Sequence, residues 1–386
     1  AALTMNKDLG LTPTVFGLAG SALSFAYLLC EIPSNLILER VGARKWLARI
    51  MITWGVASAA TMFATGPWSL AGLRALVGIA EAGFAPGLVL YMTYWYPQYR
   101  RASAQTMFML GQPLAGMLSA TVGGFILGLN GTWGLHGWQW LFLIEGAPAV
   151  LLSFSVLACL PDGPADARWL SAAEKAQIGE TLARESLPKE DLWAGVINPA
   201  IWILGIADIG IITTHYGIGL WLPLLVKATG LTAFQTGCVV AIPYVLALAA
   251  MLAWARSSDV RRERVFHVVA PALLAAAGLF AAGHLDGGAA TIVALSVVVV
   301  STYSALVVFW TFPPSFLGGT AAAGGIALVN AIGNLGGFFG PYLVGWLKDR
   351  TGGYAAGMNV LAAGLIVTAF TVYAFSRSRR APAMVG

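Results

Sequence analysis

The sequence contains little charge: only 10% of its 386 residues are Asp, Glu, Lys or Arg, whereas 58% are hydrophobic. A soluble globular domain contains about 25% charged and about 45–50% apolar residues, so this composition excludes such a domain. Hydrocarbon solvates charge poorly, and a chain with few charges and many apolar residues suits that environment. The chain is therefore predicted to be an integral membrane protein.

Cysteine and histidine are also scarce, with three and four residues respectively. Cys30, Cys159 and Cys238 each lie inside an apolar run, where a small buried side chain explains them. The Cys and His residues have no metal-site spacing, and the sequence contains no motif that pairs a nucleophile with a base. We therefore expect no cofactor, no metal ion and no enzymatic activity.

Long apolar runs, by contrast, are abundant. Eleven of them are long enough, at about 20 residues each, to cross roughly 30 Å of hydrocarbon. The alternation over about ten residues that marks a membrane barrel is absent. The predicted fold class is an all-α polytopic membrane protein with spans near 16–37, 46–65, 69–94, 102–128, 138–160, 199–226, 233–255, 265–283, 289–312, 322–347 and 354–375.

Basic residues gather on one side of the expected membrane. The short loops there carry thirteen Lys and Arg residues, against four on the other side, and the richer side normally stays in the cytoplasm. The net charge of +5 reflects this asymmetry, and we expect no nucleic-acid partner. The C-terminus and the segment 161–198 are thus predicted to be cytoplasmic, and an odd number of spans places residue 1 outside.

The segment 161–198 is the only long polar stretch, and it divides the spans into two groups. Ser171 followed by Glu174 has the capping-box spacing, which predicts a short surface helix. We expect an N-terminal bundle over 1–160, a cytoplasmic linker over 161–198 and a C-terminal bundle over 199–386. Five spans precede the linker and six follow it, which fits a six-plus-six protein that lacks its first span.

Similar turns follow the second helix of each half when that missing helix is counted. The first is Glu39-Arg40-Val41-Gly42-Ala43-Arg44-Lys45, and the second is Asp259-Val260-Arg261-Arg262-Glu263-Arg264. Both place acidic residues before basic ones at the predicted cytoplasmic end. Two repeated halves around a central linker are typical of secondary transporters.

Five charged residues lie within the expected spans: Glu31, Arg74, Glu81, Glu145 and Asp208. A charge at a helix centre costs about 2.5–3.5 kcal/mol on insertion scales, so such groups face the bundle interior. Arg74 and Glu81 are seven residues apart, which is two turns or roughly 10.5 Å along one helix face. Glu81 falls near the midplane, where it can change protonation as a cavity opens to either side. Proton coupling is one interpretation, and a static packing pair is the other.

Neutral polar side chains occur at the same depth. Tyr27, Gln112 and Asn334 fall near the midplane of their helices, where transporters bind substrate, and they suit hydroxyl and carboxylate oxygens. Each is also compatible with an ordinary interhelical hydrogen bond. For Glu31 and Glu145 we favour structural ion pairs or hydrogen bonds. Asp208 and His215 share a helix, seven residues apart, and form a possible second titratable stripe.

Three longer motifs carry a resemblance to a known family. They are Glu31-Ile32-Pro33-Ser34-Asn35 leading into the turn from Glu39 to Lys45; Arg74-Ala75-Leu76-Val77-Gly78-Ile79-Ala80-Glu81-Ala82-Gly83-Phe84-Ala85-Pro86-Gly87; and Gly333-Asn334-Leu335-Gly336-Gly337-Phe338-Phe339-Gly340-Pro341. Together they resemble the major facilitator superfamily, and within it the anion:cation symporter family, over essentially the whole chain. The chain looks most like bacterial permeases for tartrate and related hydroxy- or aromatic carboxylates.

This resemblance implies a twelve-helix fold of two six-helix bundles that works by alternating access in the bacterial inner membrane. The implied activity is proton-driven symport of a small organic anion by a monomer; an exchanger or facilitator without proton coupling is the alternative. The matching positions are Arg74 and Glu81 for proton coupling, Tyr27, Gln112, Asn334 and Thr311 for substrate contact, and Glu39, Arg40, Gly42, Arg44 and Asp259 for a cytoplasmic gating motif.

The chain departs from the family's pattern at its start. In the family, the first helix normally contributes an acidic-basic pair, of which the Arg contacts substrate and the Asp faces the fourth-helix Arg. The stretch Ala1-Ala2-Leu3-Thr4-Met5-Asn6 resembles the segment just after that helix. We expect the natural protein to have this helix, and with it part of the substrate site.

Overall fold

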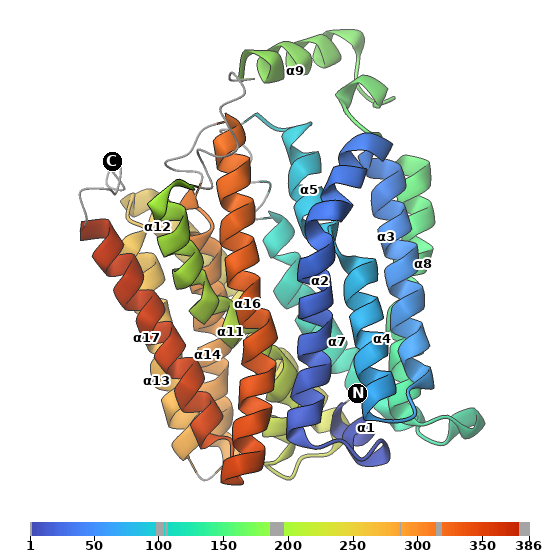
Figure 1. Cartoon of the computed structure of the whole chain (residues 1–386), viewed down its shortest axis with the longest axis vertical. Coiled ribbons are helices and arrows are strands. Elements are labelled where there is room, and N and C mark those ends of the chain that lie inside the picture. The colour runs from blue at the N-terminus through green and yellow to red at the C-terminus, as the bar shows by residue number, and fades with distance from the viewer. Residues whose placement is uncertain are drawn as a thin grey trace.

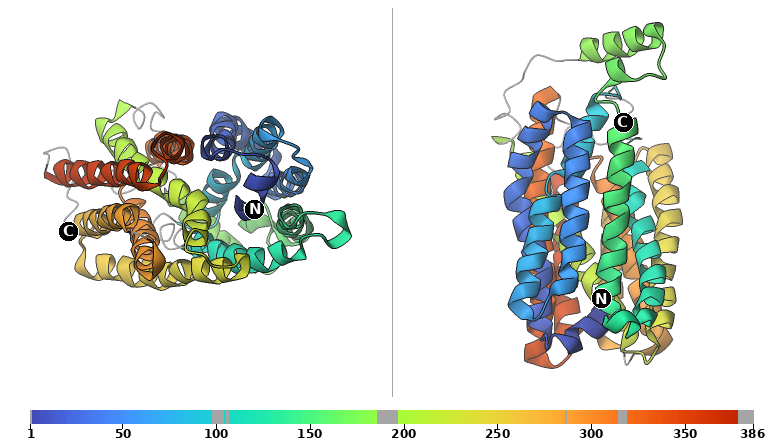
Figure 2. Two further views of the ribbon diagram at one scale, coloured as in Figure 1. Left: turned by 90° about the horizontal axis from the view of Figure 1, so that it is seen from below. Right: turned by 90° about the vertical axis from the view of Figure 1, so that its right-hand side faces the viewer.

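The computed structural model describes residues 2–97, 104, 107–185, 197–285, 287–313 and 319–377, and within these ranges the regular structure is helical, with no β-strand (Figure 1). The predicted all-α fold class is therefore confirmed. The helices run side by side along the long axis of the molecule, and α9 lies outside this bundle, at one end of it. Figure 2 shows most helices of the first part of the chain on one side of the bundle and α13, α14, α16 and α17 on the other.

The elements before residue 160 are α1 (Ala2–Asp8), α2 (Pro13–Val41), α3 (Ala43–Ala60), α4 (Pro67–Glu81), α5 (Phe84–Thr93), α7 (Gly111–Ile126) and α8 (Gly137–Cys159). The later helices are α9 (Ala172–Glu185), α11 (Pro199–Lys227), α12 (Ala233–Arg261), α13 (Val265–His284), α14 (Gly288–Phe309), α16 (Gly319–Thr351) and α17 (Ala355–Arg377). Short 3-10 turns occur at Thr61–Phe63, Leu127–Leu129, Thr132–Gly134 and Pro164–Asp166.

Ten segments among the described residues are long and apolar enough to cross a membrane, one fewer than the eleven predicted. The predicted span 322–347 lies in α16, which extends over the height of the bundle in Figure 1 but is not among the ten. Helix α16 packs against both α2 and α11. Because protein covers much of its surface, α16 tolerates glycine, asparagine and a charged last turn better than a helix surrounded by lipid.

The predicted span 69–94 consists of two helices. Helix α4 ends at Glu81, and Gly83 takes a left-handed φ of 87° before α5 begins at Phe84. A Cβ on Gly83 would overlap the hydroxyl of Ser34 in α2, so both the backbone conformation and the available space require glycine. This break places Glu81 at the end of α4. Sequence periodicity does not reveal it.

The two ends of the bundle differ in the segments they carry. The short helix α9 and the last turn of α17 lie at one end, called the linker end below, and α1 lies at the opposite end (Figure 1). Helix α9 and the end of α17 at Arg377 therefore lie at the same end of the bundle. The assignment of the linker end to the cytoplasm stays a prediction from the basic residues.

Glycines set the spacing between several neighbouring helices, as small residues do in membrane bundles. Gly55 of α3 and Gly146 of α8 face one another, and a Cβ on either would lie 2.6 Å from the other's carbonyl oxygen. Gly336 and Gly340 of α16 contact the backbone of α11 in the same way, and Gly17 of α2 contacts the backbone of Pro341. Gly336 and Gly340, four residues apart on α16, therefore serve close packing.

We expect Gly55→Leu to lower the melting temperature of the purified protein, because the new side chain would overlap the backbone of α8. Overpacking of this kind costs about 1–3 kcal/mol. Gly72→Leu in α4 is the matched control, since a Cβ there meets no atom within 4 Å. Thermal unfolding in detergent measures both variants, and an equal loss in the two would contradict this packing.

Candidate functional site

A cavity of about 310 Å³ lies between helices from the two parts of the chain, which are residues 1–160 and residues 199–386. Helices α2 and α4 contribute one side of it, and α11, α12, α14 and α16 contribute the other. Transporters hold their substrates at such an interface between repeats, so this cavity is the candidate binding site. Its wall consists of Gly20, Leu23, Ser24, Arg74, Thr214, His215, Tyr216, Ile218, Gly219, Leu220, Tyr244, Val299, Thr302, Tyr303 and Pro341.

The polar side chains of this wall suit an anion. Among the described residues that line the cavity, Arg74 is the one with a formal charge. Thr214 and Thr302 are 0% and 3% exposed, and neither hydroxyl has a hydrogen-bond partner. A guanidinium and two unpartnered hydroxyl groups can bind a carboxylate together with a second polar group.

Four aromatic rings form another part of the wall. The ring of His215 lies edge-on to the rings of Tyr216 and Tyr303, with centroids 5.2 and 5.1 Å apart, and Tyr244 lies 6.2 Å from Tyr303. Edge-to-face pairs of this kind are favourable. The sequence drew attention to His215 alone, because tyrosines inside apolar runs have no spacing that marks them as cavity residues.

The predicted pair on α4 is connected by charge and not by direct contact. Arg74 and Glu81 interact electrostatically, whereas the direct ion pairs of the described residues join other side chains. Gly78 lies between them, and the backbone of Leu23 in α2 fills the space beside it. Arg74 also interacts with Glu145 of α8, whose Oε1 accepts a hydrogen bond of 2.6 Å from Ser119.

Tyr27 lies close to the intramembrane carboxyl groups. Its hydroxyl interacts electrostatically with Glu31, Glu81 and the cavity residue Tyr216. Glu31 is 7% exposed, and its Oε1 accepts a hydrogen bond of 2.8 Å from the amide of Asn330 in α16, while Oε2 has no partner. The structure therefore brings Tyr27 to Glu81 as a neighbour but does not place it in the cavity wall.

The other three residues predicted to contact substrate also lie outside this wall. Gln112 is exposed in the first turn of α7, and Asn334 is half-buried on α16. Thr311 follows the end of α14, where its hydroxyl donates to the carbonyl of Val308 and its own carbonyl accepts from Arg264. Their roles as substrate contacts remain predictions.

The turn from Glu39 to Lys45, where a gating motif is predicted, is anchored by a residue that the sequence did not single out as its partner. The backbone N–H of Arg44 donates to Asp162 Oδ1 over 2.8 Å, and Arg44 Nε lies 3.7 Å from Oδ2. Gly42 takes a φ of 97°, and a Cβ there would lie 2.9 Å from Asp162 Oδ1. Arg40 is exposed, and the side chain of Glu39 lies outside the described part of the chain. Asp162 thus caps the start of α3.

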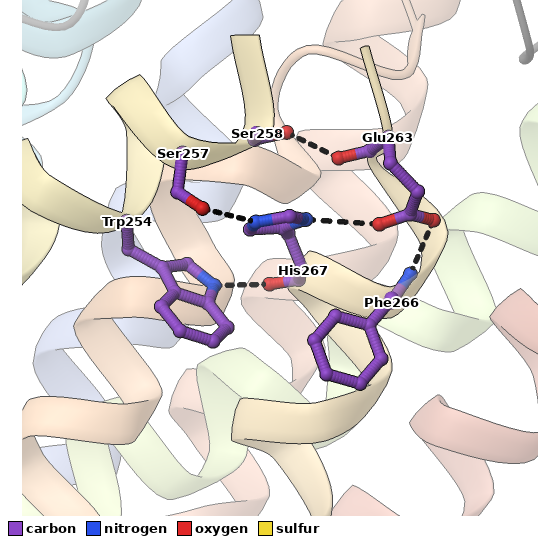
Figure 3. A network of polar contacts seen from close by, with 6 residues as sticks. All are labelled: Trp254, Ser257, Ser258, Glu263, Phe266 and His267. Atoms are coloured by element: carbon purple, nitrogen blue, oxygen red, sulfur yellow. Dashed lines mark hydrogen bonds and ion pairs between the residues drawn. The ribbon is translucent and has the colours of Figure 1, made fainter. Parts of the chain in front are cut away.

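The turn between α12 and α13, which follows the predicted gating residue Asp259, is held by a polar network around His267 (Figure 3). Its Nδ1 lies 2.9 Å from Glu263 Oε2, and its Nε2 lies 3.0 Å from Ser257 Oγ. Ser258 donates to the Glu263 carbonyl over 2.7 Å. Asp259 is exposed and takes no part in the contacts drawn. Glu263, four residues further along, supplies the carboxylate that fixes this turn.

Comparison with known proteins gives concordant results. The profile of the Major Facilitator Superfamily matches residues 1–341. A "Putative tartrate transporter" of Agrobacterium vitis is 43% identical over 98% of this chain and 88% of its own length. A "Putative metabolite transport protein NicT" of Pseudomonas putida is 40% identical over 97% of this chain and 87% of its own length.

A solved structure shares the fold. A bacterial homolog of the human lysosomal transporter Spinster, in an inward-facing and occupied conformation, superposes with a TM-score of 0.77. The alignment covers 97% of this chain and 91% of that one at 18% identity. Identity at this level supports the common fold and does not extend to substrate.

We expect Asp162→Ala to destabilise the protein by about 1 kcal/mol, because the start of α3 loses its cap. Asp162→Asn should lose less, since the amide oxygen keeps the cap and only a half-exposed ion pair disappears. Asp166→Ala, which removes an exposed acid in the same segment, is the control. Thermal unfolding ranks the three variants, and equal stability of Asp162→Ala and Asp166→Ala would refute the cap.

Proposed function

Because the chain belongs to the Major Facilitator Superfamily, we propose that it is a secondary transporter that imports a small organic anion together with protons. The observation that carries this proposal is the cavity between the two parts of the chain, with Arg74 as the formal charge in its described wall. The implied location is the bacterial inner membrane. The tartrate name of one relative and the aromatic wall support a hydroxycarboxylate or an aromatic carboxylate as substrate.

Substrate binding follows from the chemistry of the wall. The carboxylate pairs with Arg74, while Thr214 and Thr302 offer hydroxyl groups to a second polar group of the substrate. Tyr303 and His215 present ring surfaces against which an aromatic or aliphatic body packs. A ligand held there contacts both parts of the chain, so its binding responds to any movement between them.

Coupling follows from the competition for Arg74. An ionised Glu81 attracts the guanidinium and lowers its availability to a substrate carboxylate, whereas a protonated Glu81 does not. Protonation of Glu81 and binding of the anion therefore favour each other, and this mutual preference is thermodynamically reciprocal. A proton and an anion that bind together also cross together, which is symport.

Alternating access requires α2 and α16 to separate at one end of the bundle at a time. At the end opposite the linker, Asp349 Oδ2 of α16 accepts from the backbone N–H of Thr14 in α2 over 2.7 Å. Nearer the linker end, Glu31 and Asn330 join the same helices. We propose that residues 1–160 and 199–386 rock against each other as two bodies, connected by the 161–198 segment.

We expect Glu81→Gln to abolish proton-driven accumulation in proteoliposomes while part of the counterflow exchange remains. A pH difference of one unit is worth about 1.4 kcal/mol, which allows about tenfold accumulation for one proton per anion. Asp166→Asn is the control, because that carboxyl is exposed in the 161–198 segment and is not part of the cavity wall. Unchanged gradient-driven uptake in Glu81→Gln would reject its role, and wild-type uptake without proton movement would favour an exchanger or facilitator.

We expect Arg74→Gln to weaken carboxylate binding at least about tenfold, because a hydrogen bond to a charged group contributes about 1.5–3 kcal/mol. Isothermal titration of the detergent-purified protein with tartrate and with phthalate measures the loss. Arg40→Gln should leave the affinity unchanged, because Arg40 is exposed in the last turn of α2, whereas the cavity residues of that helix are Gly20, Leu23 and Ser24. The same affinity in wild type and Arg74→Gln would exclude this cavity as the carboxylate site.

A further inference from the structure

Asp208 of α11 is a buried carboxyl group that the proposed coupling through Glu81 does not use. The residue is 0% exposed, and neither Oδ1 nor Oδ2 has a hydrogen-bond partner. An ionised carboxylate in such a place loses its hydration and gains no donor or cation in return. The neutral acid loses far less, so Asp208 carries a proton in this conformation.

In the described part of the chain, no ion pair or hydrogen bond to Asp208 compensates for ionisation. Gly333 of α16 covers the side chain so closely that a Cβ there would overlap Oδ2. Among the described residues, Tyr216 is a titratable neighbour that interacts electrostatically with Asp208, and Glu31 faces the far side of α16 through Asn330. The other titratable or charged residues of α11 and the helices around it are His215 and Lys227 of α11, Lys7 and Asp8 of α1, Cys238, Tyr244, Arg256, Asp259 and Arg261 of α12, Tyr303 of α14, Tyr342, Lys348, Asp349 and Arg350 of α16, and Tyr373 and Arg377 of α17.

The position of Asp208 along α11 relates it to the cavity. Thr214 of the cavity wall follows six residues later, which is about 9 Å along the helix toward the end opposite the linker. Asp208 therefore lies between the cavity and the linker end. Tyr216, which interacts with Asp208, is itself part of the cavity wall, so the carboxyl group is electrostatically connected to the site where substrate binds.

Helix α16, which covers Asp208, is one of the helices that pack against both parts of the chain. Helix α16 packs against α11 through Gly333, Gly336 and Gly340, and it packs against α2 on its other side. Because Gly333 of α16 covers Asp208, movement of α16 away from α11 would expose this carboxyl group to water. The movement needed to expose this carboxyl group thus involves the same helix as the movement needed to open the cavity.

We propose that Asp208 is a second proton-binding site of the transporter, loaded from the cavity and unloaded at the linker end when α11 and α16 separate. This inference rests on the proposed proton-coupled transport. On unloading, the carboxyl O–H bond breaks, the proton passes to water, and a hydrated carboxylate remains. On loading, the carboxylate takes a proton from water in the cavity, so each cycle moves one proton through this site and no electrons are exchanged.

The two proton sites differ in their partners. Glu81 interacts with Arg74, so protonation of Glu81 is linked to binding of the anion by Arg74. Among the described residues, no cation pairs with Asp208, and its protonation is linked to closure of the interface between α11 and α16. One site therefore links protons to substrate, and the other links protons to conformation.

The test compares proton and anion fluxes in the same proteoliposomes. An internal pH dye and labelled tartrate or phthalate, whichever the wild type accumulates, give the number of protons per anion. We expect Asp208→Asn to move one proton fewer per anion than the wild type, and Asp166→Asn, at an exposed carboxyl of the 161–198 segment, to keep the wild-type ratio. An unchanged ratio in Asp208→Asn overturns the second site.

The outcomes separate this inference from the proposed function. Wild-type uptake without proton movement refutes the proposed coupling as a whole, whereas loss of coupling in Glu81→Gln with an unchanged ratio in Asp208→Asn refutes the second site alone. Asp208→Ser provides a smaller neutral variant in which no amide N–H needs a partner. If neither neutral variant folds, the inference is also overturned, because a carboxyl group that is already protonated contributes no charge to the fold.

Discussion

The close approach of α16 to α2 and α11 is the interaction on which the rest of this structure depends. Glycines on α16 allow its backbone to contact α11, and Gly17 of α2 allows it to contact Pro341. This contact area brings together helices from the two parts of the chain and forms one wall of the cavity. Lipid tails are as apolar as the side chains, so close van der Waals packing and interhelical hydrogen bonds hold such an interface in a bilayer.

The buried carboxyl groups are arranged around this same helix. Glu31 contacts α16 from the side of α2, through Asn330, and Asp208 contacts it from the side of α11, against Gly333. Both have oxygens without partners, which is costly in a medium that solvates charge poorly. In the proposed mechanism, the interface between α16 and its neighbours opens during transport. The cost of burying these carboxyl oxygens there fits groups that change their protonation as the interface opens.

At the linker end, an acidic side chain fixes the turn in each half of the chain, but the two halves do so differently. In the first half, Asp162, which follows α8 and is distant from α3 in sequence, caps the start of α3. In the second half, Glu263 within the turn itself binds His267 (Figure 3). The repeated acidic and basic pattern therefore produces similar turns through different contacts, because the partner of each basic segment depends on which helix ends nearby.

The sequence by itself determined the membrane class, the helical fold, most of the spans and the few charged residues inside them. Long apolar runs and scarce charge are local properties, and a bilayer imposes them on every span regardless of its neighbours. Tertiary structure alone decided which polar residues share the cavity, why Gly83 interrupts a predicted span, and that Asp162 reaches Arg44. Tyr244 and Tyr303 lie in apolar runs without any distinguishing spacing, so only the packing of the helices brings them into the same cavity wall as Arg74. Contacts between segments distant in sequence depend on how whole helices pack, and no local pattern encodes them.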